Sequence, residues 1–199
     1  MKLNAQGSRD MTKMTKTLLA VAAAVFAGTL NAATCGTSQR TATLDSADSC
    51  TTVGPINGTP GAADVLAQYP GSPWTKRGEL SGSNGTNGLF TVNADSWGED
   101  VEGTWAINPS FWTTYGEAVI TMHVGNGAGN PDWWFFDVTQ GATSGTFSYE
   151  KLSGGGGGLS NLFLWSRGTP PPPEVPLPGT LGLLGLGLVG LGAVRRRKS

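Results

Sequence analysis

The sequence contains few of the residues that most often carry catalysis or bind metals. Its 199 residues include one histidine, His123, and two cysteines. It has no Gly-x-Ser-x-Gly motif of serine hydrolases, no His-Glu-x-x-His motif of zinc proteases and no phosphate-binding loop. His123 has no partner in the sequence for acid–base chemistry, so we expect an ordinary strand residue. The sequence therefore predicts no catalytic residue, no cofactor and no metal ligand.

Basic residues are also scarce in the middle of the chain. The formal net charge of −1 hides this, because eight of the 13 basic residues lie near the two ends. Between Thr34 and Glu174 there are five basic and 13 acidic residues, which gives this part a formal net charge near −8. Nucleic acids and anionic lipids attract basic surfaces. We therefore expect neither as a partner of the central part of the chain.

Long amphipathic helices are absent. Residues 34–73 are rich in Thr, Ser, Gly, Ala and Pro, and we expect this segment to be mostly irregular. A helix of one or two turns is predicted at Ala62–Gln68, where Gly61 and Pro70 bound it closely. From Trp74 onward, short apolar or alternating runs are separated by Gly, Asn, Asp and Pro. This change in sequence pattern predicts that a folded domain occupies residues 74–167.

The runs after Trp74 have the length and alternation of β-strands. Ala118, Ile120, Met122 and Val124, for example, would lie on one face of a strand. Seven short strands with this spacing indicate an all-β fold, an antiparallel β-sandwich or jelly roll. The predicted strands are Lys76–Leu80, Leu89–Ala94, Val101–Ile107, Ala118–Val124, Trp133–Val138, Thr143–Tyr149 and Asn161–Ser166.

The N-terminal residues have the features of an export signal. Residues 1–33 are interpreted as a signal peptide with an upstream extension, since Met11 or Met14 would be a better start. The apolar run Leu18–Leu30 has the length of a signal-peptide core, and small residues follow it. We expect cleavage after Ala32 or Ala33. An exported chain can form disulfides, so Cys35 and Cys50 are predicted to pair and to staple segment 34–73. The alternative, a metal pair, lacks further ligands.

The C-terminal residues predict a single transmembrane helix. A Pro-rich linker at 168–175 leads to Val175-Pro176-Leu177-Pro178. The 18 residues from Leu177 to Val194 carry no charge, and as a helix they would span about 27 Å, close to the hydrocarbon thickness of a bilayer. The basic cluster that follows would remain on the cytoplasmic side. Its residues are Arg195, Arg196, Arg197 and Lys198.

This order of Pro motif, Gly/Leu-rich helix and Arg cluster resembles the PEP-CTERM sorting signal, here at 175–199. The resemblance implies an exosortase, a membrane protease-transpeptidase, as partner, with cleavage at the Pro motif. It implies a stay in the inner membrane, then delivery to the cell surface or the extracellular space of bacteria that make extracellular polysaccharide. Leu177 stands where the family has Glu. An ordinary membrane anchor is the alternative. Gly145-Thr146-Phe147 and Leu159–Trp165 also resemble the last strands of PEP-CTERM ectodomains, with Asn161 at a His position.

Seven tryptophans suggest one functional alternative. Exposed aromatic rings bind sugars, and Trp97 and Trp112 have the most polar surroundings, so these two are the candidate glycan contacts. A glycoside-processing enzyme needs only two suitably spaced carboxylates and remains a weaker alternative. The acidic run with Asp95, Glu99, Asp100 and Glu102 suits either calcium or a solvated turn. Our main hypothesis is a non-enzymatic exported protein associated with polysaccharide.

Overall fold

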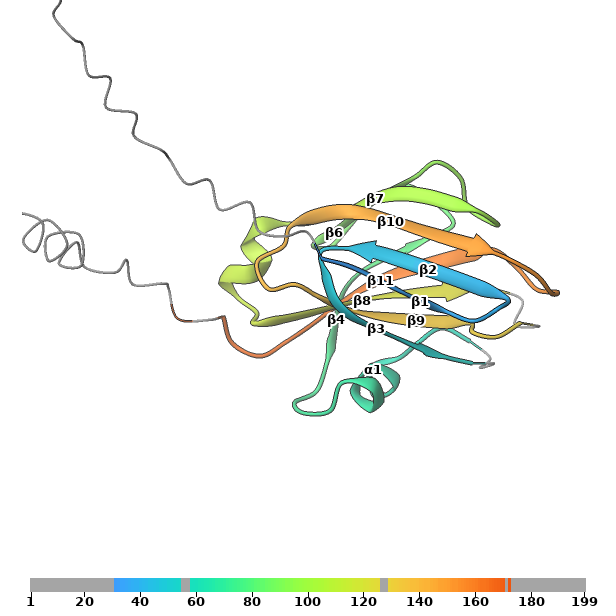
Figure 1. Cartoon of the computed structure of the whole chain (residues 1–199). Helices are drawn as coiled ribbons and strands as arrows, with labels where there is room; N and C mark the ends of the chain where they lie inside the picture. The colour runs from blue at the N-terminus through green and yellow to red at the C-terminus, as the bar shows by residue number, and fades with distance from the viewer. Residues whose placement is uncertain (1–30, 55–57, 126–128, 171, 173–199) are drawn as a thin grey trace, which may run out of the picture.

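The computed structural model describes residues 31–54, 58–125, 129–170 and 172 (Figure 1). Residues 1–30 of the predicted signal peptide and the whole predicted sorting signal at 175–199 lie outside the described residues. The described part is built mainly from antiparallel strands that form two sheets. The predicted all-β sandwich is therefore confirmed.

The six strands of the first sheet lie in the order β1-β2-β10-β7-β6-β5, and the five strands of the second in the order β3-β9-β8-β11-β4. The strand pairs of both sheets, as far as the structure describes them, are antiparallel. We call the six-stranded sheet sheet A and the five-stranded sheet sheet B. The strands are β1 (Ala32–Gly36), β2 (Arg40–Asp45), β3 (Ala47–Val53), β4 (Thr75–Ser81), β5 (Gly85–Asn87), β6 (Phe90–Ala94), β7 (Val101–Ile107), β8 (Glu117–Val124), β9 (Trp133–Val138), β10 (Ser144–Lys151) and β11 (Leu159–Arg167).

The main core fills the space between the two sheets. In β8 the predicted alternation is confirmed, because Ala118, Ile120, Met122 and Val124 all belong to this core. Trp133 and Trp134 lie on opposite faces of β9, since successive side chains of a strand alternate. Trp134 packs between the sheets, whereas Trp133 joins a second apolar cluster on the outer face of sheet B.

That second cluster forms a third layer. The helix α1 (Ala62–Gln68) and the segment around it cover the outer face of sheet B, as Figure 1 shows. Val65 of α1 and Trp74 are buried against aromatic rings of β9 and β11. The Asp64 carboxylate accepts a 2.8 Å hydrogen bond from the backbone N–H of Gly61 at the start of α1. The short helix therefore serves as a cover for apolar surface that the sheet alone would expose to water.

All seven predicted strands are present within one or two residues, but the prediction for residues 34–73 differs from the structure. The segment contains β1, β2 and β3 in addition to α1. In β2, buried Ala42 and Leu44 alternate with partly exposed Thr41 and Thr43. These strands contain few large apolar side chains, so the composition of the segment led to a prediction of irregular structure. The sandwich therefore begins near residue 32 and not at Trp74.

The predicted disulfide between Cys35 and Cys50 is confirmed. Cys35 lies on β1, an edge strand of sheet A, and Cys50 lies on β3, an edge strand of sheet B. Their Cα atoms are 6.0 Å apart, within the usual range for disulfides. The bond therefore joins the two sheets along one side of the sandwich.

The first and last described segments leave the sandwich at the same end (Figure 1). The Asn31 carbonyl accepts from Ala47 N–H, and the Gly116 N–H donates to the Arg167 carbonyl. We call this the terminal end. Four loops gather at the opposite end, which we call the loop end. They comprise residues 37–39, 95–100, 129–132 and 152–158.

Candidate functional site

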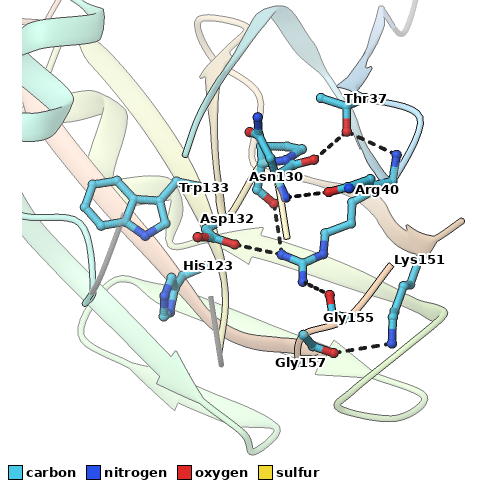
Figure 2. Close-up of polar contacts among 12 residues, drawn as sticks. Thr37, Arg40, His123, Asn130, Asp132, Trp133, Lys151, Gly155 and Gly157 are labelled. Carbon is cyan, nitrogen blue, oxygen red and sulfur yellow. Dashed lines mark hydrogen bonds and ion pairs between the residues drawn. The ribbon is translucent and has the colours of Figure 1, made fainter. Parts of the chain in front are cut away.

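A buried polar network surrounds Arg40 at the loop end (Figure 2). Arg40 begins β2, and neither its side chain nor that of Asp132 is exposed. Its Nη1 donates to Asp132 Oδ1 at 2.7 Å and to the Pro131 carbonyl at 3.1 Å. Its Nη2 donates to the Gly155 carbonyl at 3.0 Å. One guanidinium therefore joins the start of β2 to two other loops.

Close packing fixes the guanidinium in place. A Cβ at Gly129 would lie 2.4 Å from Arg40 Cζ, so a larger residue at 129 would displace the side chain. Arg40 Nε is buried and has no hydrogen-bond partner among the residues described. Gln39 adds a second link, since its Oε1 accepts from Asn130 N–H and its carbonyl from Leu152 N–H. The network stabilises the arrangement of the loops and offers no open space to a ligand.

His123 has polar neighbours that the sequence did not reveal. Its Nδ1 lies 3.1 Å from both Asn161 Oδ1 and Ser160 Oγ. The Ser160 hydroxyl also lies within hydrogen-bond distance of Asn161 Oδ1 and of the His123 carbonyl. In a nucleophilic triad, serine and the orienting acceptor contact different ring nitrogens. Here both contact Nδ1, so the cluster links β8 to β11 and has no triad geometry.

Three carboxylates of the acidic run bind groups of the protein itself. Asp95 Oδ1 accepts the N–H groups of Ser96 and Glu102, and the Glu102 N–H holds the pKa of Asp95 below its usual value. Glu99 pairs with Lys151, whose backbone N–H donates to Asp100 Oδ1. Within the described ranges, no group of three His, Cys, Asp or Glu side chains could hold a metal ion. The arrangement is that of a hydrogen-bonded turn.

The two candidate glycan contacts lie far apart. Trp97 is in loop 95–100 at the loop end, and Trp112 is in the short 3-10 helix η1 (Pro109–Thr113) at the other end of β7. The seven residues of β7 separate them by about 20 Å. Both rings are half-buried against the core, and their Nε1 groups donate to Asn84 Oδ1 and the Ala142 carbonyl, respectively. They therefore form no common stacking surface.

The other five tryptophans are 0–3% exposed. Trp97 and Trp112 are thus the two whose rings retain contact with solvent, as their turn-rich sequence surroundings suggested. Whether either ring contacts a glycan stays a prediction.

The perturbed pKa values of two groups follow from packing. Burial raises the pKa of Tyr149 to about 12, with smaller effects from neighbouring charges. Burial also raises the pKa of Asp137, to which the Asp48 and Glu117 carboxylates add. These shifts therefore reflect the fold and give no indication of catalysis.

Sheet A has an outer face that the sequence did not single out. It carries an open groove of about 630 Å³ that crosses β2, β10, β7 and β6. Most of its lining is Thr, Ser, Asn, Asp and Glu. The signal for it was the Thr or Ser at every second position of β2 and β10, which marks a solvent-facing side of a strand.

The residues predicted for sorting lie outside the described residues. They are Val175, Pro176, Leu177, Pro178, Arg195, Arg196 and Arg197. Within the part of the chain that is described, no helix has the length and apolar character needed to cross a membrane.

Comparison with known proteins gives one match. Residues 174–198 match the model of the PEP-CTERM protein-sorting motif. No curated protein and no solved structure matches the chain. The match covers the Pro motif, the apolar run and the Arg cluster together. The chain therefore carries a PEP-CTERM protein-sorting motif, which supports an exported protein that an exosortase sorts to the cell surface.

Proposed function

We propose that this protein is a non-enzymatic component of the cell surface or its polysaccharide matrix, held in the inner membrane until exosortase cleaves it near Val175–Pro178. The sorting motif at 174–198 is the observation that carries the proposal. Proline disfavours helix, so the two prolines of the motif, Pro176 and Pro178, suit a site that a protease must reach. The Arg cluster sets orientation across the membrane.

The arrangement of the domain supports this role. Chain entry near Asn31 and exit near Arg167 lie at the terminal end, so the loop end is free to face away from the point of attachment. The acidic excess between Thr34 and Glu174 keeps such a domain dispersed at the surface. The buried polar groups at Arg40 and His123 are used to hold strands and loops together. Nothing in this role requires turnover of a substrate.

Processing gives the direct test. In cells with the exosortase gene we expect the mature protein outside the inner membrane, with a mass that lacks the segment after Pro178. Without the gene, full-length protein should accumulate in the membrane fraction. Leu177→Glu, which restores the family motif, should raise the rate of processing several-fold. Full-length protein in the membrane fraction under both conditions would show that residues 175–199 act as an ordinary membrane anchor. Matrix fractionation of the mature protein tests the polysaccharide association separately.

A glycan-binding module is the second candidate, and the partial exposure of Trp97 and Trp112 favours it. Replacing a tryptophan that stacks on a sugar should weaken glycan binding by about 1–2 kcal/mol, or roughly 5–30-fold. Because each ring is half-buried, Trp97→Ala and Trp112→Ala should retain the near-UV spectrum of the folded domain. The fully buried Trp134→Ala is the contrasting control. Loss of the folded spectrum in both test variants would place these rings in the core.

A further inference from the structure

Two rows of polar side chains cross the outer face of sheet A, perpendicular to the strands. Strand pairing places Thr43 opposite Ser148 and Ser148 opposite Glu102, and the Asp95 N–H bonds to the Glu102 carbonyl. The second row is Asp45, Thr146, Thr104 and Asn93, in which Thr146 donates to Asp45 and the others are paired in register. The first row crosses β2, β10 and β7 and ends at Asp95, just after β6, whereas the second row crosses β2, β10, β7 and β6. The rows are about 6.6 Å apart.

This face is accessible, in contrast to the outer face of sheet B. Asn93, Asp95, Glu102, Thr104 and Thr146 are all exposed. α1 covers the other sheet, where the equivalent surface is aromatic and buried. The 630 Å³ groove therefore has hydroxyl, amide and carboxylate groups aimed outward from a rigid four-stranded base. Such groups hydrogen-bond to the hydroxyl and amino groups of sugars.

The groove has a consistent sign of charge. Asp95 and Glu102 line it, and an adjoining hollow of about 400 Å³ shares both residues and adds Asp100 and Glu150. Neither hollow is lined by Lys or Arg. Hydrogen bonds from backbone N–H groups favour the charged form of Asp95. An anionic polysaccharide would be repelled here, whereas a polymer with ammonium groups would be attracted.

The spacing of the sheet suits a repeating ligand. Neighbouring strands are about 4.8 Å apart, close to the repeat of a β-linked pyranose chain. A sugar chain lying along the rows would meet a similar set of polar groups at each strand it crosses. No aromatic side chain is exposed among the lining residues, since Phe147 is 3% exposed. Recognition here would depend on hydrogen bonds and charge, in contrast to stacking on Trp97 or Trp112.

We propose that the groove on sheet A binds a polysaccharide that carries free amino groups. The inference rests on the proposed function, because it names the class of polymer with which the exported protein associates. Glu102 and Glu150 are the key charged positions: both are exposed, and both belong to the acidic lining. The hydroxyls of Thr104 and Thr146 would supply neutral contacts in the row on the other side of Glu102.

The test uses mature protein purified from the producing cells and two matched probes, chitosan and its fully acetylated counterpart. At a mildly acidic pH that keeps the chitosan amines charged, wild-type protein should bind chitosan about tenfold more tightly than the acetylated polymer. Glu102→Gln/Glu150→Gln should lose that preference, and added salt should weaken wild-type binding. Glu79→Gln/Glu117→Gln removes the same charge elsewhere, from sheet B, and should bind like wild type.

The outcomes separate the groove from the broader function. Equal binding of both polymers, or equal losses in the test and control double variants, would overturn the assignment of the groove. If the groove variant is still retained in the matrix fraction of cells as strongly as wild type, the protein is polysaccharide-associated but uses another surface. If wild-type protein is absent from that fraction, the proposed polysaccharide association itself fails.

Discussion

Asp132→Ala is expected to lower the free energy of unfolding by about 3–5 kcal/mol, because it leaves the Arg40 charge buried without its carboxylate partner. Both side chains are fully buried, and the Nη1–Oδ1 distance is 2.7 Å. The remaining partners of the guanidinium are carbonyl oxygens of Pro131 and Gly155, which do not neutralise its charge. Chemical denaturation of the variant and wild type, followed by tryptophan fluorescence, measures the difference.

The surface pair Lys76–Glu79 provides the matched control. Its side chains are 47% and 34% exposed, so Glu79→Ala should cost about 1 kcal/mol or less. Replacing both buried partners, as in Arg40→Met/Asp132→Leu, should recover much of the loss, since no unpaired charge remains. A single variant as stable as wild type would show that Asp132 does not compensate the Arg40 charge. A double variant less stable than Asp132→Ala would indicate that the loops depend on the hydrogen bonds themselves.

The second half of the ectodomain was predictable because its strands carry large apolar residues at alternate positions. Val101–Ile107 and Trp133–Val138 were predicted with their observed bounds. In β8, alternation alone separated the side chains that face the core from Thr121 and His123 on the other side. Turn residues between the runs placed the ends of the strands. Both signals, alternation within a strand and turn residues between strands, can be read from a short stretch of sequence.

The first half was not predictable in the same way, because its strands carry few large apolar side chains and two of them pair with strands that are distant in sequence. β2 pairs with β10, about 100 residues later, and β3 pairs with β9. Arg40 is a lone basic residue in a Thr-rich run, and its partner Asp132 lies 92 positions away. The groove likewise combines residues of four strands. Such sites arise from strand order, which alternation within single strands does not specify.

Removal of the disulfide is the second large effect that we expect. Cys35→Ser/Cys50→Ser should lower the free energy of unfolding by about 3 kcal/mol, the chain-entropy value for a closed loop of about 15 residues. The two cysteines are 15 positions apart in sequence, and their bond joins β1 of sheet A to β3 of sheet B. β1 is an edge strand with a single hydrogen-bonded neighbour, β2, so it depends on this link more than a central strand would. Denaturation with and without reductant measures the effect on the wild-type protein.

The same bond couples the stability of the domain to export. Thiols remain reduced in the cytoplasm, and disulfides form in the exported protein. The chain should therefore be less stable before export than after it, by about the 3 kcal/mol that the double variant loses. Adding reductant to wild type should reproduce the unfolding curve of Cys35→Ser/Cys50→Ser, while the variant itself should not respond to reductant. Mature protein that retains two alkylatable thiols in its native state would contradict the coupling. So would a reduced wild-type protein that unfolds at the same denaturant concentration as the oxidised form.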